Sequence, residues 1–150
     1  MPESHPFASQ MRRLIDAAIV AGTPYASMLL DAEGNEIALT PNRVKQEQDP
    51  TSHAEMNTIR EASVRLGSAE LSGCHLITTC EPCPMCAAAV FWSGISKVTF
   101  GLSIEGITEA GHRQIPLKAE ELLKHSRNPV EIEGGLLAEE VRKLFPKKAL

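Results

Sequence analysis

Two short motifs in the chain carry residue types that could bind a metal ion together. They are His53-Ala54-Glu55 and Pro82-Cys83-Pro84-Met85-Cys86. One imidazole and two thiols can supply three of the four ligands that zinc prefers, and the fourth position then stays open for water. An open position indicates a catalytic site, because structural zinc sites take four protein ligands. Glu55 lies two residues after the histidine, where its carboxyl group could carry protons to and from that water.

The spacing within the motifs indicates that both lie at the starts of helices. Cys83 and Cys86 are three residues apart, which places both sulfur atoms on one face of a helix expected over residues 84–92. The partial positive charge at a helix N-terminus favours thiolate over thiol. His53 begins a second helix, expected over residues 53–66. Two helix starts can therefore converge on one zinc ion.

The complete pattern points to a hydrolytic deamination. An H-x-E motif followed by P-C-x-x-C is the signature of zinc-dependent nucleobase deaminases. Two thiolates and a neutral imidazole neutralise the zinc ion, which acidifies a bound water. Glu55 would accept a proton from this water and then deliver protons to a ring nitrogen and to the leaving ammonia.

A single C-x-x-C also occurs in structural zinc half-sites and in redox pairs. A structural site would need a fourth protein ligand. None of the other candidates for a fourth ligand has a second C-x-x-C spacing. These candidates are Cys74, Cys80, His75, His112 and His125. We therefore favour the catalytic site, and we expect Cys74 and Cys80 to be small buried residues.

Four further side chains are candidates for contact with a substrate, and each has a structural alternative. Glu81 could bind a substrate amino group or cap the helix that follows it. Asn42 offers an amide donor and acceptor to the edge of a heterocycle, or it serves as a turn residue. Trp92, with its neighbour Phe91, and Tyr25 could shape the pocket, or they could pack in the core, which is commoner for aromatic residues near a helix end.

Composition favours one domain in the cytoplasm. The chain has 150 residues, of which 43% are hydrophobic, enough for one ordinary core. No apolar run approaches the ~20 residues of a membrane span. Residues 1–10 lack the basic region and apolar stretch of a secretory signal. We therefore expect a single domain over residues 1–150, no membrane association, and a cytoplasmic location in which the cysteines stay reduced.

The charge balance argues against a protein whose main task is binding nucleic acid. The net charge is −4 and the isoelectric point is about 5.7, whereas proteins that bind a phosphate backbone usually carry a basic patch. Basic residues near the two termini are expected to form the solvated faces of two helices: Arg12, Arg13, Arg142, Lys143, Lys147 and Lys148.

Hydrophobic periodicity predicts strands that alternate with helices. Helices are expected over residues 7–21, 53–66, 84–92, 116–125 and 136–145, and strands over 25–30, 36–39, 74–79, 95–100 and 129–132. Residues 42–52 are expected to form a loop, and residues 101–111 a loop or short helix. This alternation indicates an α/β domain in which helices cover the faces of a sheet.

The chain resembles the cytidine deaminase-like superfamily, in particular its branch of guanine deaminases, tRNA adenosine deaminases and fungal cytosine deaminases. The residues that carry the resemblance are Asp49-Pro50-Thr51-Ser52-His53-Ala54-Glu55 and Thr79-Cys80-Glu81-Pro82-Cys83-Pro84-Met85-Cys86, within a stretch from about Pro24 to Gly111. The resemblance implies a three-layer α/β/α fold with a five-stranded mixed sheet between helices. It also implies a homodimer in which the partner helps to close the pocket. In addition, it implies that Asn42 contacts the base and that backbone groups beside Ala54 and Glu55 help to hold it.

The cysteine motif, with Trp92 after it, is most similar to that of bacterial guanine deaminases. The chain departs from them where Thr23-Pro24-Tyr25-Ala26 replaces Gly-Pro-Phe-Gly and where Arg113-Gln114 replaces an acidic pair. We expect zinc-dependent deamination of a small amino-heterocycle, in the first place a purine base or nucleoside. The wobble adenosine of a tRNA, and cytosine or cytidine, are the alternative substrates. A non-catalytic zinc-binding subunit is the alternative role.

Overall fold

The computed structural model, which describes residues 4–146, contains a five-stranded mixed sheet. Its strands are β1 (Ala26–Leu30), β2 (Glu36–Pro41), β3 (His75–Cys80), β4 (Lys97–Leu102) and β5 (Glu131–Glu133). Its helices are α1 (Ala8–Ala21), α2 (Val44–Glu47), α3 (Ala54–Leu66), α4 (Pro84–Ser93), α5 (Ile104–Glu109), α6 (Ala119–Leu123) and α7 (Ala138–Arg142). The strand order is β2-β1-β3-β4-β5. β1 pairs antiparallel with β2 and β3, whereas β3–β4 and β4–β5 are parallel.

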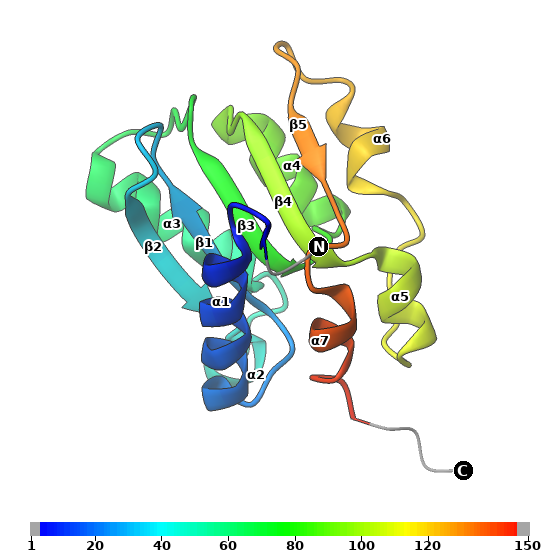
Figure 1. The fold of residues 1–150 in the computed structure, drawn as a ribbon. Helices are drawn as coiled ribbons and strands as arrows, with labels where there is room; N and C mark the ends of the chain where they lie inside the picture. Colours follow the sequence, from blue (N-terminus) through cyan, green and yellow to red (C-terminus); the bar gives the residue numbers. More distant parts are fainter. Residues whose placement is uncertain (1–3, 147–150) are drawn as a thin grey trace.

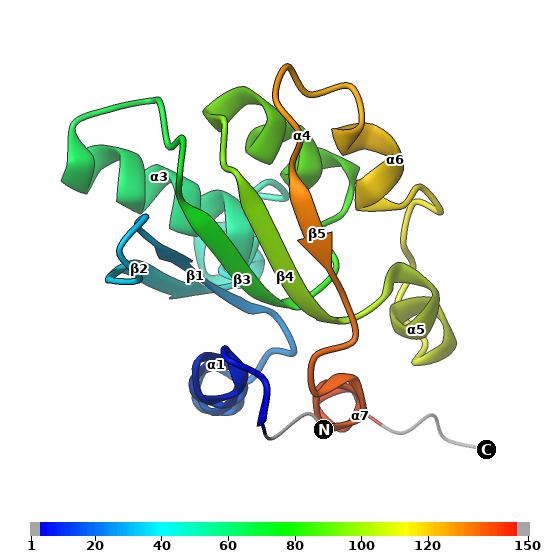
Figure 2. The same ribbon diagram turned by 45° about the horizontal axis from the view of Figure 1, so that its top comes forward.

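Helices cover both faces of the sheet, so that the fold has three layers (Figures 1 and 2). α1 and α7 lie on one face, and α3, α4 and α6 lie on the other. Parallel strands need crossover connections, which α4 provides between β3 and β4, and α5 and α6 between β4 and β5. The central strands β1 and β3 are buried along their whole length. This arrangement confirms the expected α/β/α fold.

Each face of the sheet has its own hydrophobic core. The core beneath α1 and α7 includes Met11 and Leu14 of α1 and Val141 of α7. The core beneath α3, α4 and α6 includes Val90 of α4 and Leu123 of α6. Since both cores pack against the same strands, the helix starts are held at set positions relative to the strand ends.

Three expectations for single elements differ from the structure. The loop expected over residues 42–52 contains the one-turn helix α2, none of whose residues is buried, so hydrophobic periodicity could not indicate it. α6 and α7 are each five residues long, shorter than expected. Leu137 takes a left-handed backbone conformation with φ of 53°, and α7 therefore begins only at Ala138.

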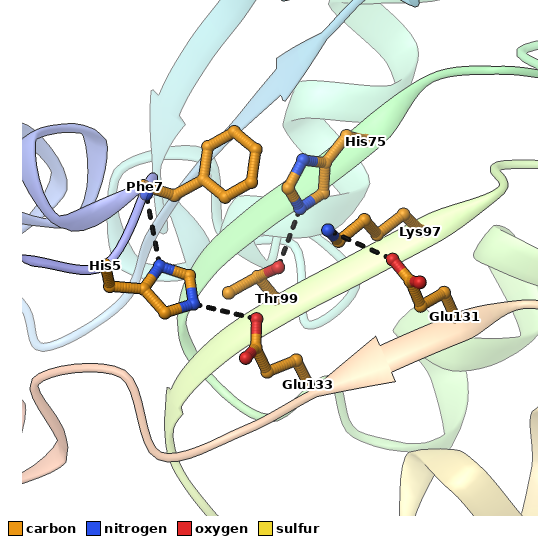
Figure 3. Close-up of polar contacts among 7 residues, drawn as sticks. All are labelled: His5, Phe7, His75, Lys97, Thr99, Glu131 and Glu133. Atoms are coloured by element: carbon orange, nitrogen blue, oxygen red, sulfur yellow. Dashed lines mark hydrogen bonds and ion pairs between the residues drawn. The ribbon is translucent and has the colours of Figure 1, made fainter. Parts of the chain in front are cut away.

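The residues before α1 are fastened to the sheet by polar and aromatic contacts (Figure 3). Nε2 of His5 lies 2.9 Å from Oε1 of Glu133 in β5, and Nδ1 of His5 accepts a hydrogen bond from the backbone amide of Phe7 at 3.1 Å. The ring of Phe7 meets the ring of His75 edge-on, with centroids 4.5 Å apart. Nε2 of His75 lies 2.7 Å from the hydroxyl of Thr99 in β4. These contacts connect the start of α1 to β3, β4 and β5.

Among residues 4–146, no helix has the length and apolar character needed to cross a bilayer.

Candidate active site

The expected zinc ligands come together at the starts of two helices. His53 and Cys83 are the N-cap residues of α3 and α4. Nδ1 of His53 lies 3.6 Å from Sγ of Cys83 and 3.6 Å from Sγ of Cys86. A tetrahedral zinc ion, with bonds of about 2.3 Å to sulfur and about 2.1 Å to nitrogen, separates these atoms by about 3.6 Å. The three side chains therefore fit a zinc ion as they stand.

No second group of this kind exists in the described part of the chain. Among residues 4–146, the set His53, Cys83 and Cys86 is the only group of at least three histidine, cysteine or acidic side chains whose ligand atoms all lie within 4.8 Å of one another. Cys74 and Cys80 are 5% and 2% exposed and lie outside this group, which confirms that they are small buried residues. The described residues thus supply three candidate ligands and no fourth.

The two ligand thiols influence each other's protonation. A hydrogen bond from Cys86 and a second one from His53 lower the pKa of Cys83 to about 4. The same bond to Cys83, together with burial, raises the pKa of Cys86 well above its ordinary value. The hydrogen bond to Cys83 also raises the pKa of His53. The pair therefore holds one thiolate, and a cation placed between the sulfur atoms would favour the second.

Glu55 lies buried at the second position of α3, directly beside the ligands. Its side chain is 5% exposed, and burial raises the pKa of its carboxyl group to about 7. The hydroxyl of Thr78 in β3 donates a hydrogen bond to it. A carboxyl group that titrates near neutral pH can both accept and donate a proton under working conditions, as a general acid–base requires.

Three buried hydroxyl groups support the start of α3 from the sheet. The hydroxyl of Thr58 lies 2.6 Å from that of Thr40 and 2.6 Å from that of Ser27. Thr40 donates a hydrogen bond to the carbonyl of Ala54 at 2.9 Å. We call Ser27, Thr40 and Thr58 the hydroxyl cluster. Sequence reasoning missed it, although a threonine on the buried face of α3, four residues after Ala54, is a visible signal.

Asn42 lies where β2 ends, and its backbone and side chain have different roles. Its amide N–H donates to the carbonyl of Tyr25 at 3.0 Å, and its side-chain oxygen accepts from the backbone N–H of Val44 at 3.4 Å. Within residues 4–146 its side-chain nitrogen has no hydrogen-bond partner. Asn42 is thus a turn residue that still presents a free amide donor.

Tyr25 lies next to Asn42, immediately before β1, and is half-buried. Burial raises the pKa of its phenol, and the negative charges of Cys80, Glu55 and Cys83 raise it further. The phenol is therefore close enough to Glu55 and Cys83 for their charges to act on it.

Glu81 binds two helix starts of the scaffold. Its carboxylate accepts backbone hydrogen bonds from Ile104, at the start of α5, and from Ala119, at the start of α6, both at 2.9 Å. The N-cap of α4 is Cys83, with no side-chain cap, so Glu81 does not cap the helix that follows it. Both of its oxygen atoms are engaged by the protein backbone.

Trp92 is not brought to the metal ligands within this chain. It lies near the C-terminal end of α4, eight residues after Pro84, which corresponds to about 12 Å along the helix. The indole is 78% exposed and meets only the edge of Phe91 among the described aromatic rings. Its exposure excludes the structural alternative that Trp92 packs in the core of this chain.

Comparison with known proteins agrees with the geometry of the site. The model of the cytidine and deoxycytidylate deaminase zinc-binding region matches residues 7–102, a stretch that contains His53, Glu55, Cys83 and Cys86. The chain belongs to this family. It is a zinc-dependent deaminase, that is, a hydrolase acting on C–N bonds of cyclic amidines.

Relatives with different substrates lie within this family. The chain is 37% identical to the guanine deaminase of Bacillus subtilis over 106 residues, which cover 67% of each protein. It is 38% identical to the tRNA-specific adenosine deaminase of the same organism over 125 residues, covering 80% of this chain and 77% of the relative. A crystal structure of a protein in complex with 8-azaguanine is similar with a TM-score of 0.81 and 27% identity, covering 93% of this chain and 81% of that one. Similarity to these relatives therefore does not by itself identify the substrate.

Proposed function

We propose that this protein hydrolyses the exocyclic amino group of a small amino-heterocycle, in the first place a guanine-like purine base or nucleoside, and releases ammonia. One observation carries the proposal: the carboxyl group of Glu55 is buried next to a group of three candidate zinc ligands. The ligand atoms of His53, Cys83 and Cys86 have the spacing of a zinc site. We assign the three ligands to zinc and the acid–base role to Glu55.

The chain's own residues divide the work of the reaction. Zinc, when bound, supplies an electrophilic centre that acidifies water. The carboxylate of Glu55 would take up one proton of water and deliver it to a ring nitrogen. It would then take the proton of the added hydroxyl group and deliver it to the departing amine, which leaves as ammonia. The side-chain amide of Asn42 orients the ring through its free N–H donor, and the backbone beside Ala54 holds the opposite edge.

Three observations support a small purine. The matching structure with 8-azaguanine holds a purine analogue, and the Bacillus relative is a guanine deaminase. The net charge of −4 gives no general attraction for a polyanion.

A tRNA adenosine is the second candidate, because a tRNA-specific relative matches over 80% of this chain. The three arginines near the two termini that the structure describes, Arg12, Arg13 and Arg142, each pair with a glutamate, which reduces the basic charge that they offer to a phosphate backbone. Lys147 and Lys148 lie outside the described residues. A gel shift with tRNA at moderate salt tests this candidate, and absence of binding removes it.

We extend the proposal to a homodimer of single-domain chains that work in the cytoplasm. The exposed indole of Trp92 supports an interface on α4, through which Trp92 would reach the pocket of a partner. Light scattering coupled to gel filtration tests the dimer. Trp92→Ala should then shift the protein towards the monomer, while an equal mass for both proteins would contradict this interface.

The experiment that tests the function is ammonia release by the zinc-loaded protein. The panel contains guanine, adenine, cytosine, their nucleosides, amino-triazines and an anticodon stem-loop RNA. We expect turnover of a free base or nucleoside, and its loss in Glu55→Ala at unchanged zinc content. Activity that survives Glu55→Ala would contradict the assigned mechanism, and turnover of the RNA alone would contradict the small substrate.

A further inference from the structure

The segment after α5 returns to the edge of the active site through one side-chain hydrogen bond. The phenol oxygen of Tyr25 lies 2.8 Å from Nδ1 of His112, although 87 residues separate them. Gln114, two residues further on, donates a side-chain hydrogen bond to the same oxygen. The segment after Gly111 therefore holds the phenol oxygen of Tyr25, a residue far from it in the sequence.

The backbone of Tyr25 is held from two sides. Its carbonyl accepts the amide of Asn42 at 3.0 Å, which ties it to the end of β2. The hydroxyl of Thr79 in β3 donates to the carbonyl of Pro24 at 2.8 Å and accepts from the amide of Ala26 at 3.1 Å. Thr79 thus clamps both neighbours of Tyr25, and the position of the phenol relative to β3 follows from it.

Tyr25 lies at the end of the sheet from which the chain runs on to the candidate metal ligands. β1 and β3 are antiparallel with Ser27 opposite Thr78, and the same register continued by two residues brings Tyr25 opposite Cys80. The charges of Glu55 and Cys83 act on the phenol. Tyr25 stands between these groups and the segment after Gly111.

A third aromatic ring buttresses the pair. Phe145, which is 6% exposed, meets Tyr25 edge-on at 5.8 Å between centroids and His112 edge-on at 4.7 Å. Packing alone could hold the rings of Tyr25 and His112 together, so a test must separate ring packing from the hydrogen bond.

The phenol can meet both partners at once. Its O–H can donate to Nδ1 of His112 while its oxygen accepts from the side-chain amide of Gln114. The phenol oxygen retains one lone pair. Held in this way, it can accept a hydrogen bond from an N–H group of a ligand.

We propose that His112 is a positioning residue, which acts through Tyr25 to aim the phenol oxygen at an N–H group on the edge of the substrate heterocycle. This inference rests on the proposed function. Loss of the phenol or of its partner weakens substrate binding more than it slows the chemical step, because neither group handles the transferred protons.

The first test needs no activity. Tyr25 is the only tyrosine in the chain, so protein labelled with ¹³C at the tyrosine ζ carbon gives one NMR signal that reports this phenol alone. We expect His112→Phe, which keeps a ring but has no acceptor, to shift the signal. His112→Asn, which keeps a polar group near the place of Nδ1, should restore it towards the wild-type position. An unmoved signal in His112→Phe would overturn the hydrogen bond.

The second test is a double-mutant cycle on kcat/KM, with zinc content and melting temperature measured for each variant. Tyr25→Phe and His112→Phe should each lower kcat/KM about tenfold, mainly through KM, as expected for one lost hydrogen bond. The double variant should be no worse than either single variant, and His112→Asn should recover part of the loss. Effects that multiply, or a loss confined to kcat, would overturn the positioning role.

The two tests distinguish failure of this inference from failure of the proposed function. If the wild-type protein releases no ammonia from any compound of the panel, the proposed function fails and the substrate contact fails with it. The hydrogen bond between Tyr25 and His112 is then still decided by the ζ-carbon signal.

Discussion

The backbone amide of Ala119 donates a hydrogen bond to Oε2 of Glu81 at 2.9 Å, across 38 residues of sequence. The other carboxylate oxygen accepts from Ile104. A residue of the cysteine motif therefore anchors the two helices that follow β4, and these helices frame the segment that carries His112.

Glu81→Gln should destabilise the protein without removing its metal. The amide that replaces one carboxylate oxygen is a donor, and it would face a backbone donor in a site that is 6% exposed. We expect a loss of about 1–3 kcal/mol in the free energy of unfolding, measured by urea denaturation of the zinc-loaded protein. Glu33→Gln, at an exposed turn position, is the matched control and should change little. Equal midpoints for the two variants would contradict the anchoring role.

Cys86→Ser should abolish stoichiometric zinc binding. The expected content is about one zinc per wild-type chain, because three ligands meet at one point, and two remaining ligands hold the ion weakly. Metal analysis after gel filtration measures this content. Cys74→Ser, which changes a buried cysteine outside the ligand group, is the control and should keep its zinc. Zinc retained in Cys86→Ser would show that another side chain completes the site.

Thr58→Val should lower both stability and activity. Valine has nearly the shape of threonine but leaves the buried hydroxyls of Ser27 and Thr40 without their shared partner, at a cost of about 1–3 kcal/mol. Since Thr40 also holds the carbonyl of Ala54, the start of α3 should lose its set position and kcat should fall. Thr58→Ser keeps the hydroxyl and should stay close to wild type. Thermal melting and ammonia release on the same samples check both effects.

Stability should fall in mild acid because of His75. Burial and then the charge of Lys97 lower its native-state pKa to about 4, below the ordinary value of about 6.5. Between these two pKa values, the imidazole of His75 is protonated in the unfolded chain but not in the native protein. This contribution is complete above about pH 6.5 and is lost as the pH falls towards 4, by up to about 3 kcal/mol.

The pH dependence of the unfolding free energy measures this effect, and the surroundings of His75 can be followed in Figure 3. His75→Gln should flatten the slope between pH 6.5 and 4. His125→Gln changes an exposed histidine and should leave the slope as it is. A slope that is the same in His75→Gln would assign the acid sensitivity to other groups.

Much of the fold could be predicted from the sequence because its signals are local. The apolar spacing in residues 8–21 and 54–66 and the glycine after each helix mark α1 and α3 within one residue. The meeting of His53, Cys83 and Cys86 could be predicted for the same reason, since His53 and Cys83 are the residues at which two helices start.

The parts that could not be predicted depend on contacts between distant segments. The partners of Glu81 and the pairing of Tyr25 with His112 arise only when β3, β4 and the segments after them are placed side by side. α2 has no buried residue and therefore carries no periodic signal. Trp92 is exposed although aromatic residues near helix ends are usually buried.

The separation of the metal ligands along the chain also bears on the order of assembly. His53 and Cys86 are 33 residues apart, and the segment between them contains α3 and β3. A zinc ion bound by both residues in the unfolded chain would close this segment into a loop. The chain would then lose less conformational entropy when it folds. Nascent chains that acquire zinc early should therefore reach the native state faster than chains that acquire it last.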